Sequence, residues 1–234
     1  MANLKEVRDR IQSVISTQQI TKAMKLVAAS KLRRAQQAIL QLRPYSEKLN
    51  AMLSNIMSVV DDVDGSVYST ERPVKNVCIV VITSNRGLCA GYNSNAIKAA
   101  VELLNGKYAD QYNAGAVSLL FIGKKGRDFL VKRYPKATII QEYTEVVGKD
   151  FSSDDSLPIA ERLMDAFENE LYDKVEIIYT RFKNAAVQDL LVEQFLPIAK
   201  AESAEGEFDA DFLFEPGKEE LLDYLIPAVL KTQF

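Results

Sequence analysis

The chain has 234 residues, of which 47% are hydrophobic, 26% charged and 9% aromatic, a composition typical of a globular protein. It contains no histidine and two cysteines, Cys78 and Cys89, which excludes histidine-based catalysis and the usual zinc sites. The cysteine spacing fits neither a metal site nor a thioredoxin motif, so we expect a reduced, cytosolic protein. No apolar run is long enough to span a bilayer, and the N-terminal residues lack the apolar core of a signal peptide.

The formal net charge of -3 combines two regions of opposite sign. Residues 1–50 contain ten basic and three acidic side chains, a balance of +7, so the rest of the chain carries -10. Nucleic acid is the obvious partner for a basic region, but these 50 residues contain one aromatic side chain, Tyr45, and no nucleic-acid recognition motif. We therefore expect a basic N-terminal region whose partner is not a nucleic acid.

Residues 1–60 predict a single long helix. There is no glycine between Asn3 and Val60, and Asn3 with Glu6 forms a capping-box pattern at the start. Apolar residues recur in a narrow seven-residue stripe, typical of a coiled-coil seam, at Leu4, Val7, Ile11, Val14, Ala28, Leu32, Ala35, Ile39, Leu42 and Leu49. The stripe shifts between residues 17 and 24, as a coiled-coil stutter would shift it.

A continuous helix of this length would be a rod about 85 Å long, at roughly 1.5 Å per residue. One apolar stripe on such a rod needs a partner helix along most of its length, so we expect the seam from Leu4 to Ile39 to be exposed unless the chain self-associates. Pro44 removes one helical hydrogen bond, and we expect it to kink the rod or to divide it into two helices.

After a polar linker, residues 61–75, the pattern changes to that of an α/β domain over residues 76–214. Strands alternate with helices of a length that implies right-handed βαβ units and a Rossmann-like, doubly wound, mostly parallel sheet. The predicted strands are 77–83, 117–122, 137–141, 175–182 and 190–198, and the predicted helices are 95–104, 124–134 and 157–171. A further helix is predicted over residues 218–231, within the segment 215–234.

The loop 84–93 follows the first predicted strand, at the edge of the sheet where doubly wound folds often bind nucleotides. A phosphate-binding loop is one interpretation. The loop matches neither G-x-G-x-x-G nor G-x-x-x-x-G-K-[ST]. We therefore favour a structural loop around Arg86 that uses Gly87 and Gly91 for its backbone angles.

Two segments together resemble a known family. TQQITKAMKLVAASKLRRAQ (residues 17–36), followed by RPY (43–45), and SNRGLCAGYN (84–93) closely resemble the γ subunit of F-type ATP synthases. The resemblance runs from the first residue through EPGKEELLDYL (215–225), and the first motif is highly specific.

The resemblance implies a central-stalk rotor subunit without an active site, cofactor or metal of its own. Its long helix would be half of a shaft inside the α3β3 catalytic hexamer, and its α/β domain a foot next to the ε subunit and the c-ring. Membrane association would arise only through the complex, at the cytoplasmic face of a bacterial inner membrane, and nucleic acid would play no part. The residues expected to contact the hexamer are Gln18, Lys22, Met24, Lys25 and Lys31.

The family continues with a long C-terminal helix antiparallel to the N-terminal one, and we expect residues 215–234 to be the beginning of that helix, with the remainder lacking. Two other interpretations stay open. One is a small nucleotide-binding α/β enzyme with a helical oligomerisation arm, and the other is an unrelated coiled-coil scaffold. Binding of ATP or NAD would favour the enzyme.

Overall fold

The structure is a computed structural model that describes residues 3–59, 67–147, 152–184, 187–198 and 218–234. The chain separates into two compact units, Met1–Asn50 and Ala51–Phe234. Each unit is described by itself below.

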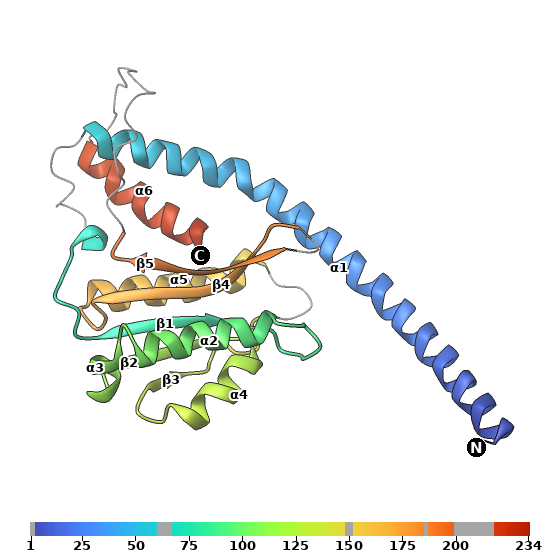
Figure 1. Cartoon of the computed structure of the whole chain (residues 1–234). Helices are drawn as coiled ribbons and strands as arrows, with labels where there is room; N and C mark the ends of the chain where they lie inside the picture. Colours follow the sequence, from blue (N-terminus) through green and yellow to red (C-terminus); the bar gives the residue numbers. More distant parts are fainter. Residues whose placement is uncertain (1–2, 60–66, 148–151, 185–186, 199–217) are drawn as a thin grey trace. The chain divides into compact units, whose positions relative to one another are not determined.

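The first element is one α-helix, α1 (Leu4–Val59), of 56 residues (Figure 1). It begins directly after Asn3, whose backbone carbonyl accepts a hydrogen bond from the Val7 N–H (3.1 Å). The helix continues through Pro44, so of the two expected effects, a kink or a division into two helices, the division does not occur. Proline lacks one N–H donor, and the loss of this single bond does not end a helix of good helix formers.

The α/β unit is built on one five-stranded sheet with the strand order β3-β2-β1-β4-β5. The first four strands in this order are parallel and β5 is antiparallel to β4. The strands are β1 (Val77–Ile82), β2 (Val117–Ile122), β3 (Thr138–Ile140), β4 (Lys174–Phe182) and β5 (Gln188–Leu196). This confirms the predicted α/β class with a mostly parallel, doubly wound sheet.

The helices of this unit cover both faces of the sheet, as right-handed crossovers on either side of β1 require. Figure 1 shows α2 and α4 in front of the sheet and α5 behind it. The helical elements are η2 (Val67–Ser69), α2 (Tyr92–Asn105), α3 (Ala109–Asn113), α4 (Lys124–Arg133), α5 (Ser153–Glu168) and α6 (Lys218–Gln233).

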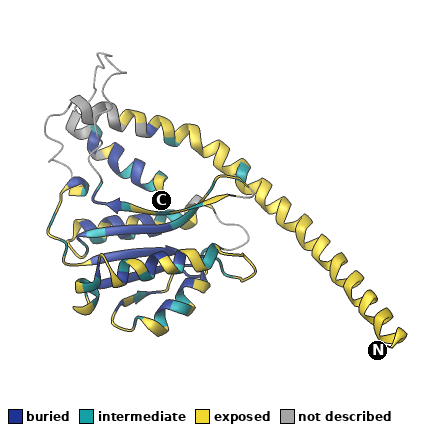
Figure 2. Cartoon of the chain, in the orientation of Figure 1, coloured by how far each residue is buried: buried dark blue, intermediate teal, exposed yellow. Residues whose placement is uncertain are grey.

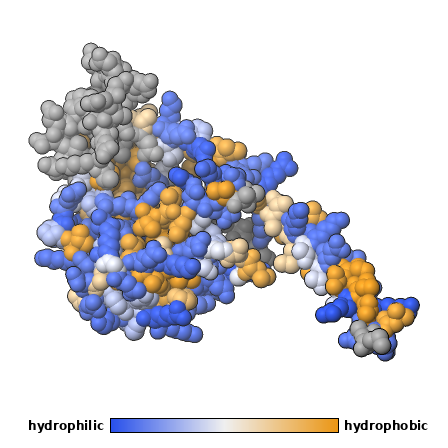
Figure 3. Space-filling model, viewed as in Figure 1, coloured by the Kyte–Doolittle hydropathy of each residue, from blue (hydrophilic) through white to orange (hydrophobic). Residues whose placement is uncertain are grey.

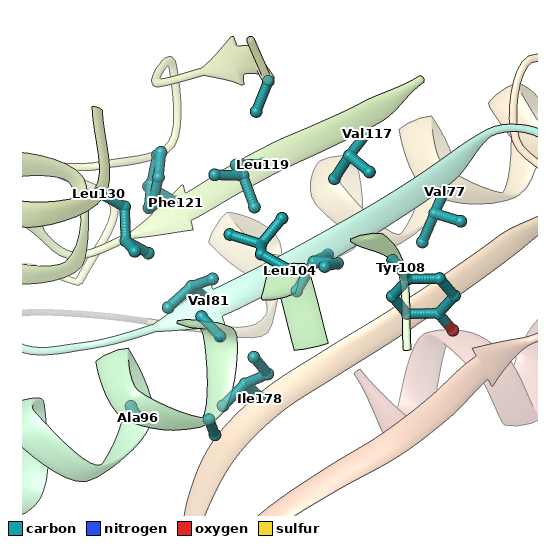
Figure 4. Packing of buried hydrophobic residues seen from close by; sticks show 14 residues of the cluster. Val77, Val81, Ala96, Leu104, Tyr108, Val117, Leu119, Phe121, Leu130 and Ile178 are labelled. Atoms are coloured by element: carbon teal, nitrogen blue, oxygen red, sulfur yellow. The ribbon is translucent and has the colours of Figure 1, made fainter. Parts of the chain in front are cut away.

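The main hydrophobic core lies between the sheet and helices α2 and α4. Alternate residues of β1 and β2 point to this side, and α2 contributes small alanines that let the helix approach the strands closely. Figure 4 shows Leu104 of α2 among side chains of β1 and β2. The core residues include Val77, Ile79, Val81, Ala96, Ala100, Leu104, Val117, Leu119, Phe121 and Leu130. The β-branched run that predicted a strand covered on both faces is therefore buried as expected.

The other face of the sheet is covered by α5, which contacts α6. Both helices bury an apolar face, with residues such as Leu163 on α5 and Ile226 on α6 almost inaccessible to solvent. The Lys231 Nζ atom of α6 lies 2.6 Å from a carboxylate oxygen of Glu161 on α5, and Phe234 packs edge-on against Phe195 of β5, with ring centroids 5.6 Å apart.

Several helix boundaries differ from the sequence prediction for local reasons. Helix α5 begins four residues earlier than expected, because Asp155 accepts a hydrogen bond from the Ser152 N–H (2.9 Å) and so fixes the helix start ahead of Pro158. Helix α2 begins at Tyr92 instead of Asn95. The short helix α3 was not predicted, because a five-residue element carries no detectable periodicity.

Candidate interaction surface

The surface of α1 is the first candidate site. The seam residues predicted from the heptad pattern are exposed from Leu4 to Leu42, with 67% of Leu4, 63% of Val14 and 49% of Ile39 accessible to solvent, whereas Leu49 is buried. Figure 2 shows most of the described part of the helix as exposed, and Figure 3 shows hydrophobic and polar residues alternating along its visible side. Within the described part of this single chain, no other segment covers the seam from Leu4 to Ile39. An apolar stripe of this length on a protein surface marks an interaction surface.

The five residues predicted to contact the hexamer lie on this helix and are all exposed: Gln18, Lys22, Met24, Lys25 and Lys31. Thr17 and Thr21, next to them, donate side-chain hydrogen bonds to backbone carbonyls four residues earlier (2.9 and 2.8 Å). These threonines are therefore satisfied within the helix. The three lysines form no ion pair within the described residues, so their charges face solvent or a partner.

The loop after β1 is the second candidate site, and its shape is fixed by hydrogen bonds. The Asn93 Oδ1 atom accepts a bond from the Ser84 N–H (2.9 Å), and the Asn93 amide donates to the Ser84 hydroxyl (2.9 Å). The Asn85 amide donates to the carbonyl of Val147 (2.7 Å). The two ends of the loop are thereby tied together, and the loop is anchored to a neighbouring segment.

The same loop also bonds backbone N–H groups at the start of α4, the helix that follows β2. A helix N-terminus binds anions through its free backbone N–H groups. Here the first three N–H groups of α4 are already bonded: Lys124 N to Asn85 Oδ1 (3.1 Å), Lys125 N to Ser84 O (3.2 Å) and Gly126 N to Thr83 Oγ1 (2.9 Å). The polar residues that follow β1 therefore hold the start of α4 against the end of β1 by hydrogen bonds, which is a structural role.

The predicted role of the loop glycines is wrong. Gly91 has ordinary helical angles (φ -79°, ψ -5°), and Gly87 does not have a positive φ. The loop residues with left-handed backbone angles are Leu88 (φ 63°) and Ala90 (φ 47°). Leu88 is 97% exposed. The hydrogen bonds of this loop stabilise the strained backbone of these two residues, and glycine is not used at either position.

The glycine that this edge requires is Gly123, directly after β2, which the sequence did not single out. It has φ 94° and ψ 144°, a combination that residues with a Cβ do not adopt. A Cβ at this position would lie 1.9 Å from the backbone oxygen of Thr83. Glycine is needed here because the backbones of β1 and β2 approach each other closely, a contact that local sequence does not reveal.

One buried ionic group lies at the opposite end of the sheet. Glu176 on β4 is 2% exposed and pairs with Lys107, and it accepts a hydrogen bond from the Tyr108 hydroxyl (2.7 Å). Burial and this bond raise the pKa of Tyr108. The second carboxylate oxygen of Glu176 has no hydrogen-bond partner among the described residues. The group links β4 to the turn between α2 and α3, which is a structural role.

The two cysteines differ in their exposure to solvent. Cys78 is fully buried in β1, and burial raises its pKa to about 12, so its reactive thiolate form is suppressed. Cys89 is exposed. Within the part of the chain that the structure describes, no group of three or more Cys, Asp or Glu residues is arranged to hold a metal ion. No helix among the described residues has the length and hydropathy that a membrane span requires.

Comparison with known proteins decides between the interpretations. Residues 3–234 match the family model described as ATP synthase. The chain is 47% identical over 237 residues to the ATP synthase gamma chain of Cytophaga hutchinsonii and 48% identical over 233 residues to that of Christiangramia forsetii. These alignments cover the whole of this chain and 79% and 78% of the two relatives. The chain belongs to the ATP synthase gamma chain family.

The solved structures agree on the fold. The central stalk and c-ring structure of the Tetrahymena thermophila mitochondrial ATP synthase contains a chain that matches with a TM-score of 0.57 at 24% identity. This match covers 92% of the present chain and 88% of the other. A long helix joined to a Rossmann-like unit is thus an architecture shared with a solved ATP synthase structure.

Family membership confirms the resemblance noted in the sequence. The family is that of the central-stalk rotor subunit of F-type ATP synthase, a non-catalytic subunit, so the protein is a peripheral part of a membrane complex. This result rejects the alternative of a small nucleotide-binding enzyme.

Proposed function

We propose that α1 forms half of a shaft that turns inside the α3β3 hexamer and couples rotation of the c-ring to ATP synthesis or hydrolysis. The observation that carries this proposal is the exposed apolar seam of α1 on a helix that also carries the basic charge of residues 1–50. The seam provides the contact to a partner helix, and the remaining surface faces the surrounding subunits. In this proposal residues 1–60 are the shaft helix, 61–75 a linker, 76–214 the foot, and 215–234 the start of the second shaft helix.

The contacts to the hexamer are assigned to Gln18, Lys22, Met24, Lys25 and Lys31. All five are exposed and lie within or after the segment 17–24 in which the heptad stripe shifts, so that polar and apolar side chains share the outer surface of the helix. Exposed ion pairs contribute only about 0–1 kcal/mol each. Lysines can therefore guide acidic segments of the β subunits without fixing the shaft in one orientation, which a rotating element requires.

The mechanism needs no chemistry in this chain. Helix α1 carries its apolar stripe on one side and mainly polar and basic side chains on the others, so the shaft is asymmetric about its long axis. As the asymmetric shaft turns, it makes three otherwise equivalent catalytic sites inequivalent, which is a coupling between distant sites through a rigid element. The foot would contact the c-ring and the ε subunit, and its rotation would be transmitted through α1.

The proposed setting is the cytoplasmic face of a bacterial inner membrane. The two named relatives are bacterial proteins, which supports this placement. The coupling ion would be H+ or Na+. The membrane contact would arise only through partner subunits, and nucleic acid is not a partner.

The test is a charge reversal on the shaft. Replacing Lys22, Lys25 and Lys31 by Glu is expected to lower ion-gradient-driven ATP synthesis or assembly, because the shaft would then repel acidic segments of the β subunits. The matched control reverses three exposed cations of the α/β unit, Lys125, Lys132 and Lys136. It should assemble and retain more of its synthesis activity. Unchanged ATP synthesis in complexes that contain the shaft variant would refute the assignment of these lysines.

A further inference from the structure

Strand β5 forms a free edge of the sheet. It is nine residues long and pairs only with β4 among the described strands. Natural sheets protect such edges with lysines, prolines or very short strands. The sequence of β5, QDLLVEQFL, contains no lysine and no proline. No strand among the described residues pairs with its outer edge, so the outward backbone N–H and C=O groups of β5 can pair with a strand of a partner.

One face of β5 carries exposed apolar side chains that continue the core. Val192 lies opposite Ile178 of β4, and Leu190 lies opposite Thr180. Ile178 is fully buried in the core beneath α2, whereas Val192 is 43% and Leu190 37% exposed. Figure 3 shows hydrophobic residues at the surface where Figure 1 draws β4 and β5. The helices on this side leave the last strand partly uncovered, so a docked element would extend the same core.

The charges of β5 disfavour a second copy of this chain as the partner. The strand has two acidic residues, Asp189 and Glu193, and no base. Antiparallel pairing of two copies centred on Leu191 would place Asp189 of one strand opposite Glu193 of the other, and like charges directly opposite are destabilising. The region outside residues 1–50 also carries -10 in each copy.

A basic strand would complement these charges. Asp189 already lies 3.7 Å from Arg181 of β4. Glu193 accepts a hydrogen bond from the Tyr179 hydroxyl (2.9 Å) and forms no ion pair within the described residues. A basic side chain opposite Glu193 would supply the missing counter-charge.

We propose that β5 is a docking edge for a strand of a different polypeptide in the complex. The incoming strand places apolar side chains next to Leu190 and Val192 and a basic side chain next to Glu193. Backbone hydrogen bonds to the free edge provide the contact, and the alternating side chains provide the selectivity. This inference rests on the proposed function, since it takes the partner from the assembled ATP synthase.

The test compares hydrogen exchange of β5 in the free chain and in the assembled complex. Alternate amides of β5 are expected to exchange at least about tenfold more slowly in the complex than in the free chain, because each outward N–H gains a hydrogen-bond partner. A chain with Leu190→Lys and Val192→Lys should lose this protection. A chain with Glu193→Lys, which keeps the apolar face, should show reduced protection. Leu171→Lys, at an exposed leucine outside the sheet, is the control and should keep it.

The exchange of α1 in the same samples separates this inference from the proposed function. Protection of α1 together with equal exchange of β5 in free and assembled chains would overturn strand docking alone. Protection of β5 that survives in the Leu190→Lys, Val192→Lys chain would also overturn it. Absence of protection in α1 would count against the shaft assignment instead.

Discussion

Replacing Gly123 by Ala tests whether the close approach of β1 and β2 holds the α/β unit together. The new Cβ would lie 1.9 Å from the Thr83 backbone oxygen and 2.6 Å from its carbonyl carbon. Both atoms belong to the backbone, so a rotamer change cannot relieve the clash. The peptide around residue 123 would have to move, which would disturb the hydrogen bonds of Thr83 N to Ile122 O (2.7 Å) and of Gly123 N to Thr144 O (3.1 Å).

The expected cost has two parts. A residue with a Cβ in this backbone region costs about 1–3 kcal/mol, and overpacking of a tight contact costs about 1–3 kcal/mol. The free energy of unfolding should therefore fall by about 2–6 kcal/mol, a large part of the roughly 5–15 kcal/mol typical of a domain. In a unit of this size the melting temperature should fall by roughly 5–20 °C.

Urea unfolding followed by near-ultraviolet circular dichroism measures this loss. The chain has no tryptophan, and nine of its ten tyrosines lie beyond residue 50, so the signal reports the α/β unit rather than most of α1. The control is Gly87→Ala, because the nearest atom to its new Cβ is the flexible end of Lys125 at 4.0 Å. Its stability should stay within about 0.5 kcal/mol of the wild-type value. If the Gly123→Ala and Gly87→Ala chains unfold at the same urea concentration, the close-approach argument is wrong.

Four further outcomes are expected from the same chain. Lys107→Met should lower the free energy of unfolding by about 1–3 kcal/mol, because the buried Glu176 carboxylate loses its counter-charge; wild-type stability would contradict this. Cys89 should react with a thiol reagent in the native protein, and the buried Cys78 only after unfolding; two fast thiols would contradict the burial of β1. Burial and a carboxylate neighbour raise the pKa of Tyr179 to about 12, above its unfolded value of 10.0. The contribution of Tyr179 to stability is therefore complete below pH 10 and is lost as the pH rises toward 12. In Tyr179→Phe, denaturant titrations between pH 10 and 12 should show a smaller fall in the free energy of unfolding than in the wild type. An equal fall in both chains would contradict the raised pKa of Tyr179. Calorimetric titration of the isolated chain with ATP should show no binding. Micromolar affinity would contradict a purely structural role of the loop 84–93.

Local sequence was sufficient for α1, for the five strands and for the longer helices of the α/β unit, but not for the short helices η2 and α3. A run of good helix formers without glycine predicted α1, and β-branched runs predicted the buried strands, because hydrophobic periodicity and backbone propensity act over a few neighbouring residues. The motif around Lys22 and the loop around Arg86 were enough to indicate the family. The heptad stripe also predicted the exposed seam of α1. The identity of the residues that contact other subunits remains a prediction from the sequence.

Only the tertiary structure showed which residues the edge of the sheet depends on. The sequence pointed to Gly87 and Gly91, yet the left-handed angles fall on Leu88 and Ala90, and the obligatory glycine is Gly123. These positions are set by contacts between segments about 40 residues apart, such as the bond from Gly126 to the Thr83 hydroxyl. The free edge of β5 likewise follows from strand order. The sequence by itself determined most of the elements and the family, because their signals are local. The tertiary structure decided which residues hold the loops at the ends of the strands together and which strand has an unpaired edge. Both depend on which distant segments of the chain become neighbours.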